Sequence, residues 1–339
     1  MSFDPRTDSR LDPRLRDFLT LFPVSSVDDV ANREELLADK EFLSVVDAST
    51  AIFDMLDSEE NASSTGLAIT SFDISSAPDG NTIKIRYIRP DTDAELPCVY
   101  YIHGGGMQVH SCFMGHYRAW ARLIAAQGVA VVMVDFRNCL TPSSVPEVAP
   151  FPAGLNDCVS GLHWIVDHAA EIGINTSKIM IAGESGGGNL AIATALKLKE
   201  SGDISLINKV YALCPFISGE WPLPEHPSAT EFANTVIAIN SNRSRMAYGV
   251  EAFNEKNPLA WPRFASRDDL TGLPPFFISV NELDPLRDEG LEFYQKLLEA
   301  GVNAQCRTVN GTAHGTEIFF ICPEASQETA RSIASFCAN

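Results

Sequence analysis

The stretch Ile179-Met-Ile-Ala-Gly-Glu-Ser-Gly-Gly-Gly-Asn-Leu-Ala-Ile-Ala-Thr-Ala-Leu196 decides the fold. A short apolar run ends at Gly183, and apolar residues resume at Leu190 with the spacing of a helix. The segment is therefore predicted to form a strand, a sharp turn and a helix. Residues 183–187 fit the pattern G-x-S-x-G, in which a strained turn exposes the serine hydroxyl above the edge of a sheet.

Two other interpretations of this turn have to be weighed. A glycine-rich turn can simply let one backbone segment pass close to another, and short motifs match by chance. A phosphate-binding loop is disfavoured, because the stretch lacks G-x-x-x-x-G-K-[S/T] and does not match G-x-G-x-x-G. The serine turn therefore needs support from the rest of the chain.

The overall composition excludes several classes of protein. The 339 residues are 45% hydrophobic and 20% charged, as in an ordinary soluble α/β protein. The net charge of -19 repels nucleic-acid phosphates and anionic lipid, so no nucleic-acid partner is expected. The N-terminus lacks the pattern of a signal peptide, and the apolar runs are too short to span a membrane. The composition predicts a cytoplasmic protein.

The eight cysteines are scattered without C-x-x-C spacing, which predicts reduced and mostly buried thiols. His110, Cys112 and His116 lie close together in the sequence and suggest a metal site. No second Cys/His pair follows at zinc-finger spacing, so a metal is disfavoured.

Strands alternate with helices along most of the chain. Apolar runs predict eight strands, at residues 67–72, 82–88, 97–102, 129–135, 178–183, 208–213, 275–280 and 304–309. Helical spacing separates the later strands, at residues 117–127, 153–172, 189–201, 289–301 and 324–337. This alternation predicts an α/β fold, in which an eight-stranded, mostly parallel sheet carries helices on both faces.

Two regions do not follow this alternation. Residues 1–60 predict two or three amphipathic helices, which either pack on the core or form part of a lid. Residues 215–262 are too long for a structureless loop and predict an inserted helical cap. The expected organisation is an N-terminal cap segment at 1–60, a core at 61–214 and 263–339, and a cap segment at 215–262.

Residues suited to activating a serine follow other predicted strands. His103-Gly104-Gly105-Gly106 comes directly after the third strand, as does the glycine loop that supplies backbone N–H groups to an oxyanion hole. Asp284 follows the seventh strand and His314 follows the eighth. The order Ser185, Asp284, His314 is that of α/β-hydrolases rather than of chymotrypsin or subtilisin.

Other residues compete for these roles. Glu282 and Asp288 lie near enough to Asp284 to replace it as the acid. Among the remaining histidines, His103 is expected to anchor its loop. The others are expected on a helix, in the cap or along the pocket, and they are His163, His168, His226, His110 and His116.

From about residue 60 to the end, the chain resembles carboxylesterases of the hormone-sensitive lipase type, a branch of the α/β-hydrolase fold. The resemblance rests on His103-Gly-Gly-Gly106, Gly183-Glu-Ser-Gly-Gly187, Asp284-Pro-Leu-Arg-Asp288 and His314-Gly315. It implies that Ser185 is the nucleophile, His314 the base and acid, and Asp284 the group that orients the histidine. It also implies that the N–H groups of Gly105, Gly106 and Gly186 form the oxyanion hole, and that no cofactor or metal is needed.

The sequence departs from the usual family pattern at the turn itself, where Glu184 and Gly186 replace Asp and Ala of G-D-S-A-G-G. This variant is similar to that of brefeldin A esterases. Residues 135–142 match D-Y-R-L-A-P-E only loosely, so the shape of the pocket stays open. Large apolar residues form a candidate pocket for a short or medium acyl chain, and these are Met107, Phe113, Phe216 and Trp221.

The expected activity is therefore hydrolysis of a small-molecule ester through an acyl-enzyme. The same catalytic residues would serve a lactonase, an amidase or a thioesterase. A ligand-binding relative without activity is a third alternative, although such proteins typically lose the base, and His314 is present. Assembly as a homodimer stays open.

Overall fold

A computed structural model of the chain describes residues 3–21, 27–233 and 235–339. Its strands form one eight-stranded sheet in the order β1-β2-β4-β3-β5-β6-β7-β8. The strands are β1 (Leu67–Ser76), β2 (Asn81–Pro90), β3 (Leu96–Ile102), β4 (Ala130–Asp135), β5 (Ile174–Glu184), β6 (Lys209–Leu213), β7 (Phe276–Asn281) and β8 (Ala304–Val309). β2 pairs antiparallel with β1 and β4, and every other neighbouring pair is parallel. The predicted fold class is confirmed.

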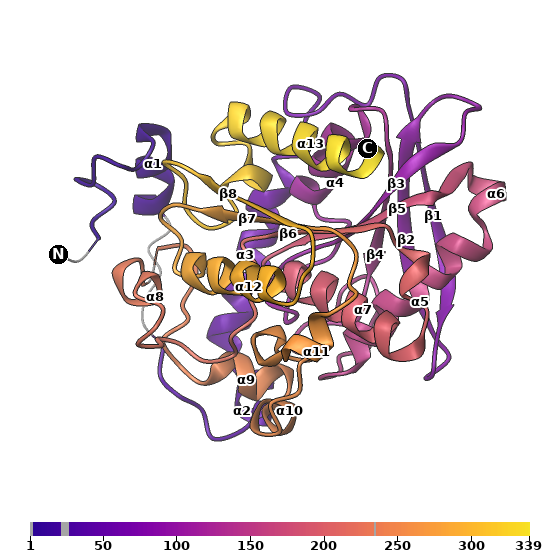
Figure 1. Cartoon of the computed structure of the whole chain (residues 1–339). Helices are drawn as coiled ribbons and strands as arrows, with labels where there is room; N and C mark the ends of the chain where they lie inside the picture. The colour runs from indigo at the N-terminus through magenta and orange to yellow at the C-terminus, as the bar shows by residue number, and fades with distance from the viewer. Residues whose placement is uncertain (1–2, 22–26, 234) are drawn as a thin grey trace.

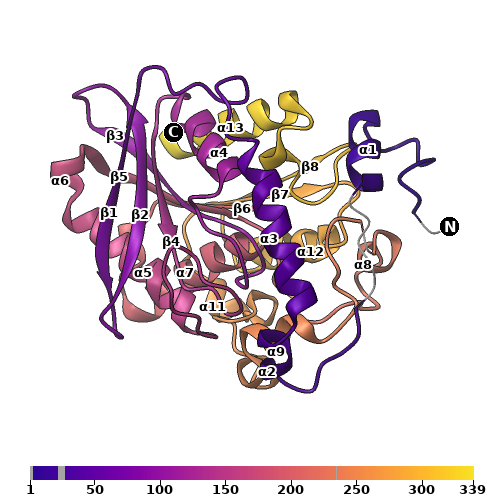
Figure 2. The ribbon, with the colours of Figure 1, turned by 180° about the vertical axis from the view of Figure 1, so that it is seen from behind.

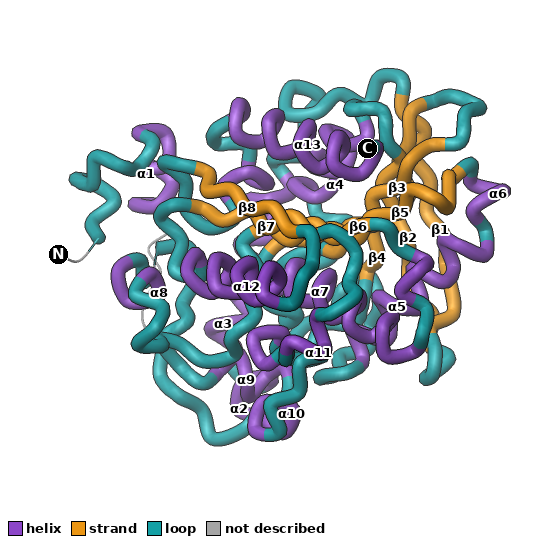
Figure 3. The backbone as a smooth tube through the Cα atoms, viewed as in Figure 1, coloured by secondary structure: helices purple, strands orange, loops and turns teal. Residues whose placement is uncertain are grey.

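Helices cover both faces of this sheet (Figures 1 and 3). The longer ones that pack on it are α4 (Gly115–Ala125), α5 (Ala153–Asp167), α7 (Gly186–Ser201), α12 (Arg287–Glu299) and α13 (Pro323–Ala338). α4 and α13 lie on one face, and α5, α7 and α12 lie on the other (Figure 1). Shorter elements complete the core, and they are α6 (Ala169–Ile172), η1 (Ile204–Leu206), α11 (Arg267–Leu270) and η3 (Thr316–Phe319).

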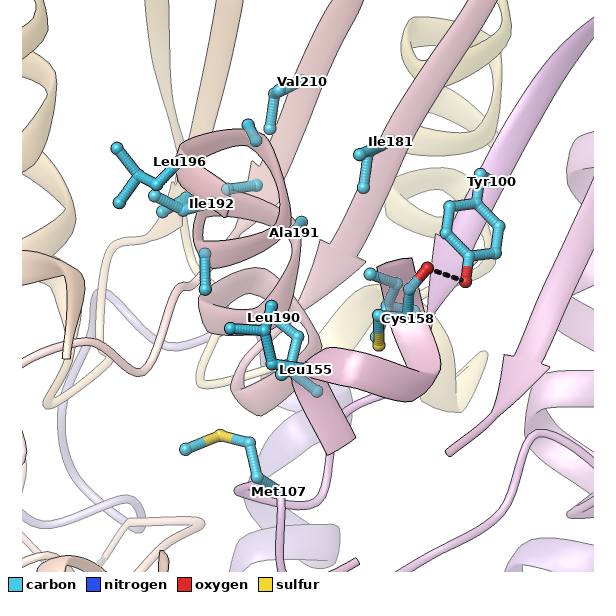
Figure 4. Packing of buried hydrophobic residues seen from close by; sticks show 14 of the residues in the cluster. Tyr100, Met107, Leu155, Cys158, Ile181, Leu190, Ala191, Ile192, Leu196 and Val210 are labelled. Atoms are coloured by element: carbon cyan, nitrogen blue, oxygen red, sulfur yellow. Dashed lines mark hydrogen bonds between the residues drawn. The ribbon is translucent and has the colours of Figure 1, made fainter. Parts of the chain in front are cut away.

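Alternation along the central strands divides the core into two layers. Tyr100 and Ile102 of β3 pack with α5 and α7, whereas Val99 and Tyr101 pack with α4 and α13. Figure 4 shows the first layer, where Tyr100 donates a hydrogen bond to the Cys158 carbonyl at 2.7 Å. All eight cysteines are free thiols and seven of them are buried, as predicted.

Residues outside the sheet layers form one long helix, α3 (Lys40–Asp54), and several shorter ones. At the N-terminus the shorter ones are α1 (Pro13–Leu21) and α2 (Arg33–Leu37), and between β6 and β7 they include α8 (Ser228–Glu231), α9 (Arg243–Tyr248), α10 (Val250–Asn254) and η2 (Pro262–Phe264). The two segments touch: the Val30 amide donates to Asn242 at 2.9 Å, and Arg10 pairs with Glu231 at 2.9 Å. Figure 2, seen from behind, shows α3 extending from near α4 toward α2 and α9.

Several predicted boundaries were wrong by a few residues. The helix predicted over 153–172 is two helices, because the chain leaves helical geometry at His168. The helix predicted to start at Asn189 starts at Gly186, directly after the serine. The division into cap and core segments stays a prediction. Within the described ranges, no helix combines the length and the apolar character that crossing a membrane requires.

Candidate active site

Ser185 stands at the junction between β5 and α7. Its backbone has φ 53° and ψ -120°, a strained conformation for a residue with a side chain. The junction is tight, because a Cβ added to Gly187 would lie 2.0 Å from the carbonyl oxygen of Ile102. Glycine at 187 therefore lets α7 start against the end of β3, and the strained turn leaves the Ser185 hydroxyl at the carboxyl edge of the sheet.

Three side chains from distant parts of the sequence meet at this hydroxyl. Ser185 Oγ lies 2.9 Å from Nε2 of His314, and Nδ1 of His314 lies 2.9 Å from Oδ2 of Asp284. A carboxylate only accepts hydrogen bonds, so Nδ1 carries a proton, and Nε2 accepts from the serine when the ring is neutral. The Leu286 amide holds the carboxylate by donating to Oδ1 at 2.8 Å.

The surroundings of His314 favour its charged form. Burial acts to lower the pKa of His314, but the negative charge of Asp284 acts in the opposite direction and prevails. The pKa of His314 therefore lies well above its ordinary value. An imidazole stabilised in this way is a strong acceptor for the proton of a neighbouring hydroxyl.

The competing acids have other partners. Glu282 accepts a hydrogen bond from the Gly311 amide at 2.7 Å, and Asp288 accepts from the Ser228 amide at 2.7 Å. Asp284 is the carboxylate that faces His314. His103 anchors its loop, since its Nδ1 lies 2.9 Å from the Gly104 carbonyl and its ring stacks on Phe136.

The glycine loop after β3 lies against the serine turn. A Cβ added to Gly186 would lie 2.7 Å from the Gly106 amide nitrogen and 2.6 Å from that of Met107. The backbones at positions 106 and 186 therefore approach as closely as glycine allows. Gly186 is also the first residue of α7, where an N–H group has no partner within the helix.

Similarity to known proteins agrees with this geometry. Residues 99–318 match the family described as alpha/beta hydrolase fold. The chain belongs to the α/β-hydrolase family.

This hydrolase is similar to named esterases over most of its length. It is 33% identical to carboxylesterase NlhH of Mycobacterium tuberculosis, over 76% of this chain and 79% of that protein. The solved structure of esterase Est22 is 53% identical, has a TM-score of 0.97, and covers 100% of both chains. Brefeldin A esterase, a bacterial homologue of human hormone-sensitive lipase, is 36% identical with a TM-score of 0.89, over 98% of this chain and 95% of that one. The expected relationship to these enzymes and the class of carboxylic ester hydrolase are confirmed.

The four candidate pocket residues of this hydrolase fall into two groups. The Phe216 amide donates to the Ser185 carbonyl at 3.0 Å, and the Phe216 ring stacks on Trp221 at a centroid distance of 4.5 Å. Met107 is buried beside Gly186, and Figure 4 shows it below Leu190 and Leu155. Phe113 lies with the other layer of the core. It packs against the residues around α4, and the Arg86 guanidinium lies 5.7 Å from the centre of its ring.

The sequence did not identify Cys214 as part of the site. This residue follows β6 and lies beside Asp284 and His314. Among the described residues, one cluster of potential metal ligands has its atoms within 4.8 Å of one another, and it consists of Cys214, Asp284 and His314. The histidines and cysteine near position 112 that the sequence suggested are not part of it. Two members of the cluster already bond to each other, and burial raises the pKa of the Cys214 thiol to about 11.

Glu184 was the second residue with an unrecognised role. Its side chain is buried and accepts hydrogen bonds from Tyr101 of β3 at 2.6 Å and from Tyr117 of α4 at 2.5 Å. Burial raises the pKa of Glu184 to about 7, although its hydrogen-bond donors act to lower it. The only hint in the sequence was its replacement of the usual aspartate beside the serine.

Proposed function

We propose that this hydrolase cleaves short- to medium-chain acyl esters with Ser185 as nucleophile, His314 as general base and acid, and Asp284 as the residue that orients and charges the histidine. One observation carries the proposal: the unbroken chain from Ser185 Oγ through His314 to Asp284, with both contacts at 2.9 Å. A nucleophile, a base and an orienting acid in this order are what acyl transfer requires.

The reaction has two stages. Ser185 Oγ attacks the ester carbonyl while His314 Nε2 takes its proton, and the histidine then gives that proton to the leaving alcohol. Water, deprotonated by the same nitrogen, attacks the acyl-enzyme and releases the carboxylic acid. Asp284 stays ionised throughout and stabilises the imidazolium that forms at each stage.

The developing oxyanion needs fixed donors. The amides of Gly105, Gly106 and Gly186 supply them in this proposal, and the close approach of the Gly106 and Gly186 backbones supports it. Among the described residues, the Gly105 and Gly106 amides donate to no other backbone group. Donors already in position cost no reorganisation when charge develops, and each contributes a factor of about 10² to 10³ in rate.

The acyl chain is proposed to lie along the stacked rings of Phe216 and Trp221. Phe216 supports this through its direct backbone hydrogen bond to Ser185, and Met107 through the close approach of its backbone nitrogen to Gly186. A pocket walled by rings so near the nucleophile favours short or medium acyl chains over long ones.

The test is ester hydrolysis by the wild type, Ser185→Ala and Ser326→Ala, on p-nitrophenyl esters from acetate to palmitate. Ser326 is a buried serine of α13 and serves as the matched control. We expect Ser185→Ala to lose at least about 10⁴-fold in kcat and Ser326→Ala to stay near the wild type. Unchanged turnover by Ser185→Ala would refute the nucleophile, and a rate that rises steadily toward palmitate would refute the chain-length preference.

The alternatives have separate signatures in the same assay. Lactones, amides and thioesters at matched acyl groups report whether another bond is cleaved faster. A fluorophosphonate probe followed by mass spectrometry reports whether Ser185 is reactive at all. Absence of labelling would favour a ligand-binding protein without activity.

A further inference from the structure

The carboxylate of Glu184 links three elements around the serine turn. Its Oε2 accepts from the Tyr101 hydroxyl of β3 at 2.6 Å. Its Oε1 accepts from the Tyr117 hydroxyl of α4 at 2.5 Å and from the Gly104 amide at 2.6 Å. The side chain is 2% exposed, so these three donors replace the water that a carboxylate would otherwise bind.

Gly104 directly precedes Gly105 and Gly106, whose amides are the proposed oxyanion donors of this loop. Its amide also lies 2.9 Å from the Tyr117 hydroxyl oxygen, which closes a small ring of hydrogen bonds with Glu184. A Cβ at position 104 would lie 2.4 Å from Glu184 Oε1, so the contact requires glycine there. The serine turn and the glycine loop are thus tied together by the residue directly before the nucleophile.

We propose that Glu184 is a positioning residue, whose carboxylate holds Gly104 and thereby keeps the Gly105 and Gly106 amides in register with Ser185. It touches no substrate and acts only through the loop. This inference rests on the proposed function, because it concerns the oxyanion donors of that reaction.

Two substitutions of Glu184 distinguish the role of its hydrogen bond to Gly104 from the role of its negative charge. Glu184→Asp keeps the charge and introduces the residue that is usual in the family, but it shortens the side chain by one methylene and so draws the oxygens away from the Gly104 amide, which lies 2.6 Å from Oε1 of glutamate in this chain. Glu184→Gln keeps the reach: its Oε1 can accept from Gly104 and Tyr117, and its Nε2 can donate to the Tyr101 oxygen. The proposal therefore expects the isosteric amide to work and the shorter acid to fail.

The experiment measures kcat and KM for p-nitrophenyl butyrate together with the Ki of an alkyl trifluoromethyl ketone. Ser185 Oγ adds to the ketone carbon, the proton moves to His314, and the ketone oxygen becomes an anion in the proposed oxyanion hole. We expect Glu184→Asp to lower kcat about 30-fold, leave KM within about 3-fold, and raise the Ki in proportion to the loss in kcat/KM. Glu184→Gln should stay within about 3-fold of the wild type in all three.

Tyr100→Phe is the control for a lost buried hydrogen bond, since Tyr100 lies on the same strand but bonds to Cys158 on the opposite face. If Glu184→Asp does not fold, Tyr117→Phe is the second variant. It removes the hydroxyl shared by Gly104 and Glu184 and should lower kcat about 5-fold with KM unchanged.

Near-normal kcat in Glu184→Asp, or an equal loss in Glu184→Gln, would overturn the proposal. So would a loss that appears in KM while the Ki for the ketone is unchanged. If Ser185→Ala is as active as the wild type, the proposed function itself has failed. If Ser185→Ala is inactive and Glu184→Asp is not impaired, only this inference has failed.

Discussion

The edge of the sheet and the helices that lie outside it are held in different ways. At the edge, the side chains of Ser185, Asp284 and His314 are buried and connected by hydrogen bonds, and glycine backbones approach as closely as sterics allow. Helix α3, by contrast, has no fully buried residue among its fifteen described ones. The difference teaches that the edge of the sheet is held by close backbone contacts, whereas α3 is held by side chains that are only partly buried.

The largest effect should come from the edge, in Asp284→Asn. Loss of the charge removes what holds Nδ1 protonated, so kcat/KM should fall about 10⁴-fold. The pKa of His314 should also fall, because the Asp284 charge is the strongest of the interactions that raise it above its ordinary value. Since activity requires neutral His314, the acidic limb of the kcat/KM profile should move to lower pH in the variant.

Glu282→Gln is the matched control for that experiment. Glu282 is the nearby acid that the sequence left in competition, and it bonds to the Gly311 amide rather than to His314. We expect its kcat/KM to stay within about 3-fold of the wild type. A larger loss in Glu282→Gln than in Asp284→Asn would show that the orienting acid has been assigned wrongly.

A smaller but still large effect is expected from the backbone contact at Gly187. In Gly187→Ala the new Cβ would lie 2.0 Å from the Ile102 carbonyl oxygen, so α7 and β3 must separate. We expect the free energy of unfolding, measured by urea denaturation, to fall by about 3 kcal/mol. Gly128→Ala meets no atom within 4 Å and changes only the cost of its positive φ, about 1 kcal/mol, so equal losses in the two variants would contradict the steric explanation.

The residues at the carboxyl edge of the sheet could be predicted from the sequence, because each lies close in sequence to a strand that its apolar run reveals. Ser185 directly follows β5, and Asp284 and His314 lie three and five residues after the ends of β7 and β8. Parallel strands bring their carboxyl ends to one edge. β8 was predicted at its observed bounds for the same reason. Gly186 to Gly188 were missed as helix because glycine has low helix propensity, which the packing of α7 overrides.

Contacts that depend on the folded arrangement could not be predicted. Glu184 meets Tyr117 only because α4 packs across the end of β3, and no spacing in the sequence records this. From the sequence, Cys214 is predicted only to be a buried thiol, because its place beside His314 depends on the position of β6 in the folded sheet. The region between β6 and β7 was predicted to be helical, but its helices α8, α9 and α10 have only 4, 6 and 5 residues. These helices are too short to present a continuous apolar face, so the apolar residues of this region pack individually.

We expect the smallest effect from a substitution in a helix outside the sheet, Phe53→Ala in α3, and this variant tests the comparison directly. Phe53 of α3 stacks on Phe319 at a centroid distance of 5.2 Å and makes a tilted ring contact with His116 at 4.6 Å, so it joins the helix to the turn after His314 and to the start of α4. Phe53→Ala should cost about 1 kcal/mol of ring contact and change kcat/KM by about 5-fold, mostly through KM, because the catalytic groups keep their positions. Val45→Ala, an exposed position on the same helix, controls for changes in the helix itself and should match the wild type. A loss of kcat in Phe53→Ala comparable to that of Asp284→Asn would mean that α3 helps to hold the reacting groups in place, and the contrast between the edge of the sheet and α3 would have to be abandoned.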